Sequence, residues 1–283
     1  MTRVTTLLTC LILTAASIHG QGLEPLDLAK KIFGKEKVMK MGSFITGEYK
    51  GRPNGKDLQK GSTTTFTLLG QTATTAVVAM TVLDTVGKGL DTYLHFKKEN
   101  TWKMSAFRAL AMTGMIEQIK MELEKMTPQQ VDTIISKSKA SEKEKGFALF
   151  SSREDYDFQL GNAKLILELD SNIIQHFLNN KAAFESIKEM AFKELETPKT
   201  DGERNIRLLE SSKSTYQKLF ISSISYGGYE TGSNSLNFLI GGMLDNTVGY
   251  LYVKDKKDLP KMNPSNIIMI REIGNGWYVY KTT

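Results

Sequence analysis

Cysteine is nearly absent from this sequence of 283 residues: it has one, Cys10, inside an N-terminal segment typical of a secretion signal. Residues 1–20 carry a positive residue, Arg3, followed by an apolar and small-residue run, Val4–Ile18, that is too short to span a bilayer. Removal of this segment leaves a chain without cysteine. That excludes disulfides, thiol catalysis and thiolate metal sites in the mature protein.

The predicted signal has two candidate cleavage points, before Gln21 and after Ser17. A lipid-modified Cys10 is the alternative interpretation. Because only a few apolar residues precede Cys10 and the run continues past it, we interpret it as an ordinary residue of the signal. We therefore expect a periplasmic or secreted protein.

Long apolar runs and charge of one sign are also scarce. The longest apolar stretch after the signal, Leu236–Val253, is interrupted by Gly241-Gly242 and Asp245-Asn246, so we expect two strands there rather than a membrane span. The formal net charge of +6 is spread over interleaved Lys and Glu without a basic stripe. This pattern favours neither a membrane-spanning protein nor a nucleic-acid partner.

Residues that commonly carry chemistry are few. Only His95 and His176 lie outside the signal, and neither has a ligand-spaced carboxylate beside it, so we predict no metal and no cofactor. No Gly-x-Ser-x-Gly motif is present. Ser136 and Lys139 form a Ser-x-x-Lys pair, but their charged, solvated surroundings would keep the lysine protonated. We predict no catalytic residue.

Two hairpin-like segments dominate what is present, Thr92–Leu110 and Ile267–Thr283. Each consists of an apolar strand, an Asn-x-Trp turn and a second strand, and they contain the only two tryptophans, Trp102 and Trp277. Asn275-Gly276 is the strongest hairpin signal in the chain. Strand alternation places Trp102, Met104, Ala106 and Arg108 in phase on one face of the first segment.

The same order of elements occurs twice, which predicts an α+β fold of two lobes, although two unrelated α+β domains remain an alternative. A short amphipathic helix, residues 23–34, precedes about five strands in the first half, and helical residues 114–150 follow. In the second half, residues 163–169 fit strand or helix equally, and helices over 170–197 precede five strands. The predicted units are the signal (1–20), an N-terminal domain (23–113), a helical linker (114–153) and a C-terminal domain (154–283).

Four residues are candidates for weak ligand binding. His95 lies opposite Leu94 and Phe96, where we expect a surface or cleft position. Arg108 ends an apolar stripe and either extends to solvent or binds an anion in a pocket. Tyr250 and Tyr252 share one face of a strand and either line a ligand-binding concavity or belong to the sheet face itself.

The endings ENTWKMSAFRAL and GNGWYVYKTT resemble those of the cystatin-like superfamily, which includes nuclear-transport-factor-like folds. The resemblance covers residues 23–110 and 172–283. It implies that each lobe is a helical segment packed on a curved antiparallel sheet, although the first helix is short for this superfamily. Residues 238–283 also resemble the tail of uncharacterised exported proteins of Bacteroidetes-type bacteria, which implies export but no activity.

Three functions fit these observations. The first hypothesis is a non-enzymatic binding or interaction module with an unknown protein or small-molecule partner. The second is a small-molecule or lipid binder, or a hydrolase-like enzyme, that uses the concave face of one sheet. The third is a structural subunit that pairs through sheet edges. A fold of this kind does not decide among them.

Overall fold

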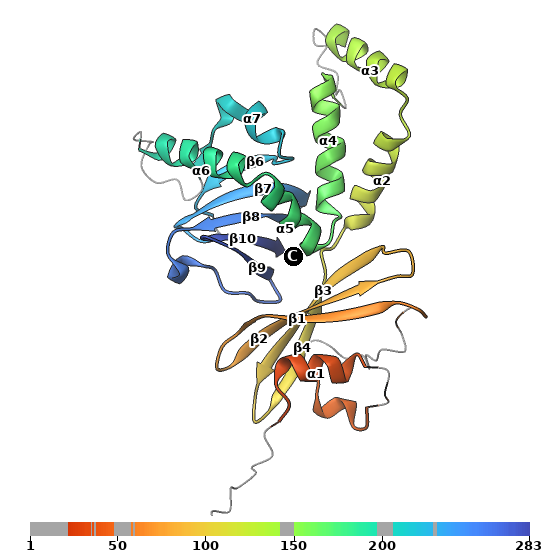
Figure 1. Ribbon diagram of the computed structural model, residues 1–283, viewed down its shortest axis with the longest axis vertical. Coiled ribbons are helices and arrows are strands. Elements are labelled where there is room, and N and C mark those ends of the chain that lie inside the picture. The colour runs from red at the N-terminus through yellow and green to blue at the C-terminus, as the bar shows by residue number, and fades with distance from the viewer. Residues whose placement is uncertain are drawn as a thin grey trace, which may run out of the picture.

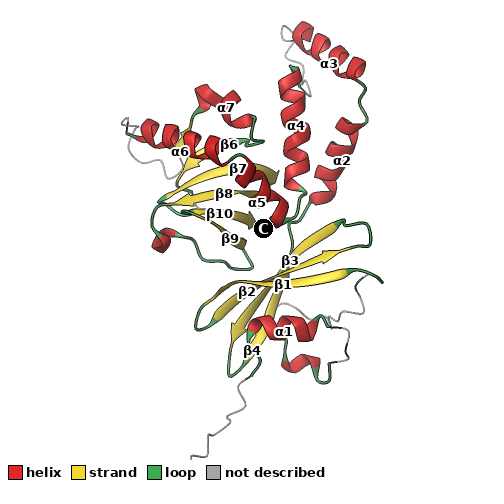
Figure 2. Cartoon of the chain, viewed as in Figure 1, coloured by secondary structure: helices red, strands yellow, loops and turns green. Residues whose placement is uncertain are grey.

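This computed structural model describes residues 22–34, 36, 38–47, 58, 60–141, 150–196, 206–228 and 231–283. These residues form seven α-helices and two antiparallel sheets, of four and six strands, which confirms the α+β class (Figures 1 and 2). The predicted signal lies outside the described residues. The helices are α1 (Pro25–Ile32), α2 (Thr113–Glu124), α3 (Pro128–Ser141), α4 (Arg153–Ile166), α5 (Asp170–Asn179), α6 (Lys181–Leu195) and α7 (Lys213–Gln217).

The N-terminal sheet is a meander in which each strand pairs with the next one along the chain. Its strands are β1 (Thr63–Gln71), β2 (Thr75–Leu83), β3 (Gly89–Lys98) and β4 (Trp102–Arg108). Threonine and valine are enriched in β1 and β2, as expected for strands. Of the strand expected over residues 43–50, the described part contains one bridge, between Ile45 and Met104 beside the edge strand β4.

Both faces of the N-terminal sheet are covered. On one face Leu28 and Ile32 of α1 pack against a cluster that includes Val78 and Leu94. On the other face Tyr93 belongs to a core that continues into the second sheet. This two-sided burial explains why residues 76–80 of β2 are buried without alternation.

A β-bulge in β4 corrects the predicted alternation of this strand. His95 pairs with Ala106 and Phe96 pairs with Met104, so Ser105 is an extra residue between the two pairs. Trp102 and Met104 therefore face α1, whereas Ala106 and Arg108 face the second sheet. The four residues do not form one stripe.

The C-terminal sheet has the order β5-β6-β7-β8-β10-β9, so β10 lies inside the sheet while β4 lies at the edge of its own. The two tryptophan strands therefore occupy different positions. Asn275 and Gly276 both have positive φ, 54° and 82°, as a two-residue type I′ hairpin requires. The strands are β5 (Ile206–Leu208), β6 (Ser223–Tyr226), β7 (Ser235–Met243), β8 (Asn246–Val253), β9 (Ile267–Gly274) and β10 (Trp277–Thr282).

Helices α5 and α6 cover one face of the C-terminal sheet through aromatic side chains (Figure 1). The ring of Phe177 lies 4.7 Å from that of Phe184 and 4.9 Å from that of Trp277. The ring of Phe184 also meets Tyr250 edge-on at 4.9 Å. Aromatic pairs at these separations add to the stabilisation from burial alone. Trp277 is thus the centre of this core.

Helices α2, α3 and α4 form an arm that projects from the sheets at its α3 end (Figure 1). The last turns of α4 pack against β7, where the amide of Asn162 donates to the carbonyl of Ile240 at 2.6 Å. The arm has a small core of its own, built on Leu123, Val131, Phe150 and Tyr156. The helices predicted over residues 114–150 are α2 and α3 as far as residue 141. Most of residues 163–169, which fit strand or helix equally, belong to the end of α4 and the turn after it.

Candidate functional site

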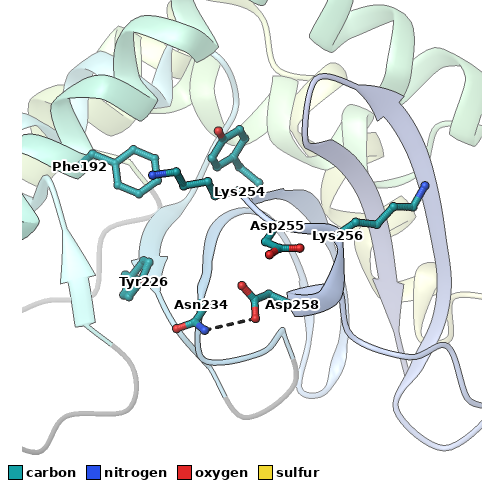
Figure 3. A pocket seen from close by; sticks show the side chains of 8 residues that line it. Phe192, Tyr226, Asn234, Lys254, Asp255, Lys256 and Asp258 are labelled. Atoms are coloured by element: carbon teal, nitrogen blue, oxygen red, sulfur yellow. Dashed lines mark hydrogen bonds between the residues drawn. The ribbon is translucent and has the colours of Figure 1, made fainter.

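A pocket of about 560 Å³ lies at one end of the C-terminal sheet, beyond the ends of β6 and β8 (Figure 3). Its volume falls in the range that small-molecule pockets usually occupy. We call it the β8-end pocket. Its lining residues are Phe192, Tyr226, Asn234, Tyr252, Lys254, Asp255, Lys256 and Asp258.

Three half-buried aromatic rings form the apolar part of the β8-end pocket. Tyr252 is near the end of β8, where it pairs with Trp277 of β10, and their ring centroids are 5.2 Å apart. Phe192 reaches the same ring from α6, edge-on at 5.8 Å. Tyr226 is the last residue of β6. Each ring is therefore held by a regular element.

An ion-pair network fixes Tyr252 near Phe192. The ammonium group of Lys188 lies 4.7 Å from the centroid of the Tyr252 ring, a cation–π contact. It also pairs with Glu185 at 2.6 Å and with Glu189 at 3.1 Å. The indole N–H of Trp277 donates to Glu185 at 3.0 Å. Burial opposes the charge on Lys188, but these carboxylates raise its pKa above the ordinary value.

The polar part of the pocket comes from the loop after β8. The carboxylate of Asp255 accepts the backbone N–H of Lys257 at 3.0 Å and pairs with the ammonium of Lys257 at 2.9 Å. These hydrogen bonds hold the pKa of Asp255 below its ordinary value. The amide of Asn234 donates to Asp258 at 3.3 Å, and Figure 3 shows both beside Asp255. This side presents carboxylate acceptors and an amide.

A second cluster of titratable groups lies between the two sheets, formed by Asp91, Tyr93, Asp170 and Lys281. We call it the intersheet cluster. One oxygen of Asp170 accepts the hydroxyl of Tyr93 at 2.8 Å and the ammonium of Lys281 at 2.9 Å. Asp91 accepts the backbone N–H of Asp170 at 2.6 Å and a hydroxyl from Thr81. Tyr93 and Asp91 come from the N-terminal sheet and Lys281 from β10, so the cluster joins both sheets.

Burial sets the electrostatics of the intersheet cluster. The side chains of Asp170 and Lys281 are 1% and 5% exposed. Burial, and then the nearby charge of Asp170, raises the pKa of Asp91. The same two causes, in the same order, raise the pKa of Tyr93 well above its ordinary value. Since solvent and substrates do not reach these groups, we interpret the cluster as a structural link.

The four residues singled out from the sequence lie in different surroundings. Tyr252 lines the β8-end pocket, whereas Tyr250 is in the core, where its hydroxyl donates to the carbonyl of Ile173 at 2.8 Å. Burial raises the pKa of Tyr250.

The expected surface or cleft position of His95 is wrong: its ring is buried on the face of β3 that the second sheet covers. The Nε of Arg108 donates to the carbonyl of Pro264 at 2.6 Å, across to the loop before β9. Of the four residues, the structure therefore brings Tyr252 alone into the pocket.

Most of the pocket was not foreseen in the sequence. Phe192 lies on a helix whose apolar residues are explained by core packing, and Asp255 and Asp258 lie in a charged loop after a strand. The one usable signal is the adjacency of the tyrosine-bearing strand to the loop KDKKD, because the end of a strand places its loop beside the sheet.

No protein-family model, curated protein or solved structure matches this chain, so the argument for function rests on the site itself. Among the described residues, no helix combines the length and the apolar character needed to cross a membrane. Within the same part of the chain, no group of three or more His, Cys, Asp or Glu side chains is arranged to hold a metal ion.

Proposed function

We propose that this chain is an exported, non-enzymatic binding module that holds a small polar ligand in the β8-end pocket. The observation that carries the proposal is the pocket itself, about 560 Å³ with aromatic rings on one side and polar groups on the other (Figure 3). Pockets with an apolar lining and a few converging polar groups are the usual form of small-molecule sites.

The electrostatics of the pocket supports binding rather than acid–base chemistry. A general acid that works near neutral pH needs a raised pKa. Hydrogen bonds from Lys257 instead hold the pKa of Asp255 below its ordinary value. Among the described residues, the carboxyl group whose pKa burial raises is that of Asp91, which is buried between the sheets.

Native mass spectrometry of the full chain after incubation with a cell extract tests this proposal. We expect a retained mass that disappears in Phe192→Ala, because the substitution removes one aromatic wall. Phe44→Ala is the matched control, since Phe44 is also a half-buried phenylalanine but lies in the N-terminal part of the chain. Equal retention by both variants, or no retained mass in the wild type, would contradict the proposal.

Export and cystatin-like ancestry are part of the same proposal. The N-terminal apolar run supports export, and the two Asn-x-Trp endings support a relation to cystatin-like lobes and to exported proteins of Bacteroidetes-type bacteria. Packing of α1 on one sheet and of α5 and α6 on the other is compatible with such lobes. Fractionation of the native host with N-terminal sequencing is the test. An exported form should begin near Gln21, and an uncleaved cytosolic form would refute export.

A further inference from the structure

The polarity of the β8-end pocket is divided between two sides, and this division restricts the ligand. The rings of Phe192 and Tyr226 lie on one side, and the carboxylates of Asp255 and Asp258 lie across the pocket with Asn234 (Figure 3). A matching ligand has an apolar face and a polar edge. Because the rings are flat, the apolar face must also be flat.

The charges lining the pocket cancel. Lys254 and Lys256 contribute two positive charges, and Asp255 and Asp258 contribute two negative charges. Lys256 pairs with Glu272 at 3.3 Å, while Asp255 is already paired within its own loop. A ligand with a large net charge of either sign therefore meets no matching field.

Lys254 and Asp258 are then the charged groups best placed to meet a ligand. Among the described residues, neither forms an ion pair, and the carboxylate of Asp258 accepts a hydrogen bond from the amide of Asn234. The ligand therefore meets an ammonium donor, a carboxylate acceptor and an amide that can do both. Hydroxyl groups, which donate and accept, satisfy all three at no net charge.

We propose that the β8-end pocket binds a short neutral carbohydrate, an inference that rests on the binding function proposed above. The C–H face of a pyranose ring is flat and apolar and stacks on Tyr226 and Phe192, while its equatorial hydroxyls point to Asp258, Asn234 and Lys254. A zwitterionic amino acid is the alternative ligand, since its carboxylate could pair with Lys254 and its ammonium with Asp258. However, Lys254 is exposed, and exposed ion pairs contribute little affinity in water, so we favour the neutral sugar.

Saturation-transfer NMR on the full chain tests the ligand class. The probes are glucose, galactose, N-acetylglucosamine, maltose and cellobiose, with zwitterionic phenylalanine and cationic choline as charged comparisons. We expect transfer to the ring protons of at least one neutral sugar and none to the charged probes. Titration calorimetry should then show about tenfold weaker binding in Asp258→Asn, because a charge-assisted hydrogen bond is weakened.

Asn234→Ala is a second variant, at an exposed position, and should also weaken binding, so a folding defect in Asp258→Asn would leave the test intact. Asp27→Asn is the control, because Asp27 is exposed on α1, far along the chain from the pocket. Preference for phenylalanine or choline, with the same sensitivity to Asp258→Asn, would overturn the carbohydrate assignment but keep the binding function. Absence of binding by every probe would overturn the carbohydrate assignment. The retained mass in the extract experiment would then decide on the binding function separately.

Discussion

Replacement of Lys281 by methionine should destabilise the folded protein strongly. Methionine keeps much of the apolar stem of lysine but removes the ammonium group that pairs with Asp170 at 2.9 Å. The carboxylate of Asp170 then stays buried, with Asp91 close by and the hydroxyl of Tyr93 as its remaining side-chain donor. Loss of one partner of a buried ion pair typically costs about 3–5 kcal/mol. We expect a decrease of that size in the free energy of unfolding at pH 7.

Urea unfolding followed by tryptophan fluorescence measures this effect. The two tryptophans are both buried, Trp102 in the N-terminal sheet and Trp277 in the C-terminal sheet, so emission reports on both. Lys256→Met is the matched control: its partner Glu272 lies 3.3 Å away, but the two side chains are 74% and 56% exposed. Exposed pairs contribute about 0–1 kcal/mol, so this variant should unfold almost as the wild type does.

A double-mutant cycle separates the ion pair from simple loss of packing. Asp170→Asn keeps an oxygen that can accept the hydroxyl of Tyr93. Because asparagine is neutral, no buried carboxylate is left without a partner when Lys281 is also replaced. The double variant Asp170→Asn with Lys281→Met should therefore lose less stability than the sum of the single variants, by up to about 3 kcal/mol. The reasoning is refuted if Lys281→Met costs no more than Lys256→Met, or if the two single effects simply add.

Three further substitutions test other parts of the structure. Burial raises the pKa of Asp91 above 3.8, so the stability that this group contributes is present at low pH and is lost as pH rises through the folded-state pKa. Asp91→Asn should therefore be more stable than the wild type at pH 7. A lower urea midpoint for the variant would contradict this. Burial lowers the pKa of His176 below 6.5, so the folded protein loses stability as pH falls below that value. In thermal melts, His176→Gln should lose less stability on acidification than the wild type does. An unchanged pH dependence of the melting temperature would disprove this role of His176. Gly242 has φ 153°, and a Cβ there would overlap the carbonyl oxygen of Asn246. Gly242→Ala should therefore lower the free energy of unfolding in urea by about 1–3 kcal/mol or more. An unaltered urea midpoint would contradict this backbone geometry.

Local patterns predicted the strands and turns well. The type I′ turn at Asn275-Gly276 has a strong sequence signature because both positions need positive φ. The bulge at Ser105 has no such signature, since an extra residue with ordinary φ leaves the composition of a strand unchanged. One residue was enough to move Arg108 to the opposite face and to invalidate the predicted stripe.

Tertiary contacts decided the parts that local patterns could not predict. His95 lies on a strand face with polar neighbours, and only the second sheet buries it. Lys281 likewise occurs in a strand that could have been half exposed. The β8-end pocket combines Phe192, Tyr226 and Asp258 from separate elements, and their proximity depends on how a helix, a strand end and a loop pack together. Tyr252 was foreseen because its strand is rich in tyrosine.

The internal position of β10 has a consequence for folding during synthesis. The N-terminal sheet pairs its strands in chain order, so it can assemble as the chain emerges. The C-terminal sheet cannot assemble in this way, because β8 and β9 both pair with β10, which follows every other described element along the chain. Until then two unpaired strand edges are open to misassociation. The same late strand carries Lys281, so pairing of β10 completes both the second sheet and the ion pair with Asp170 in the intersheet cluster.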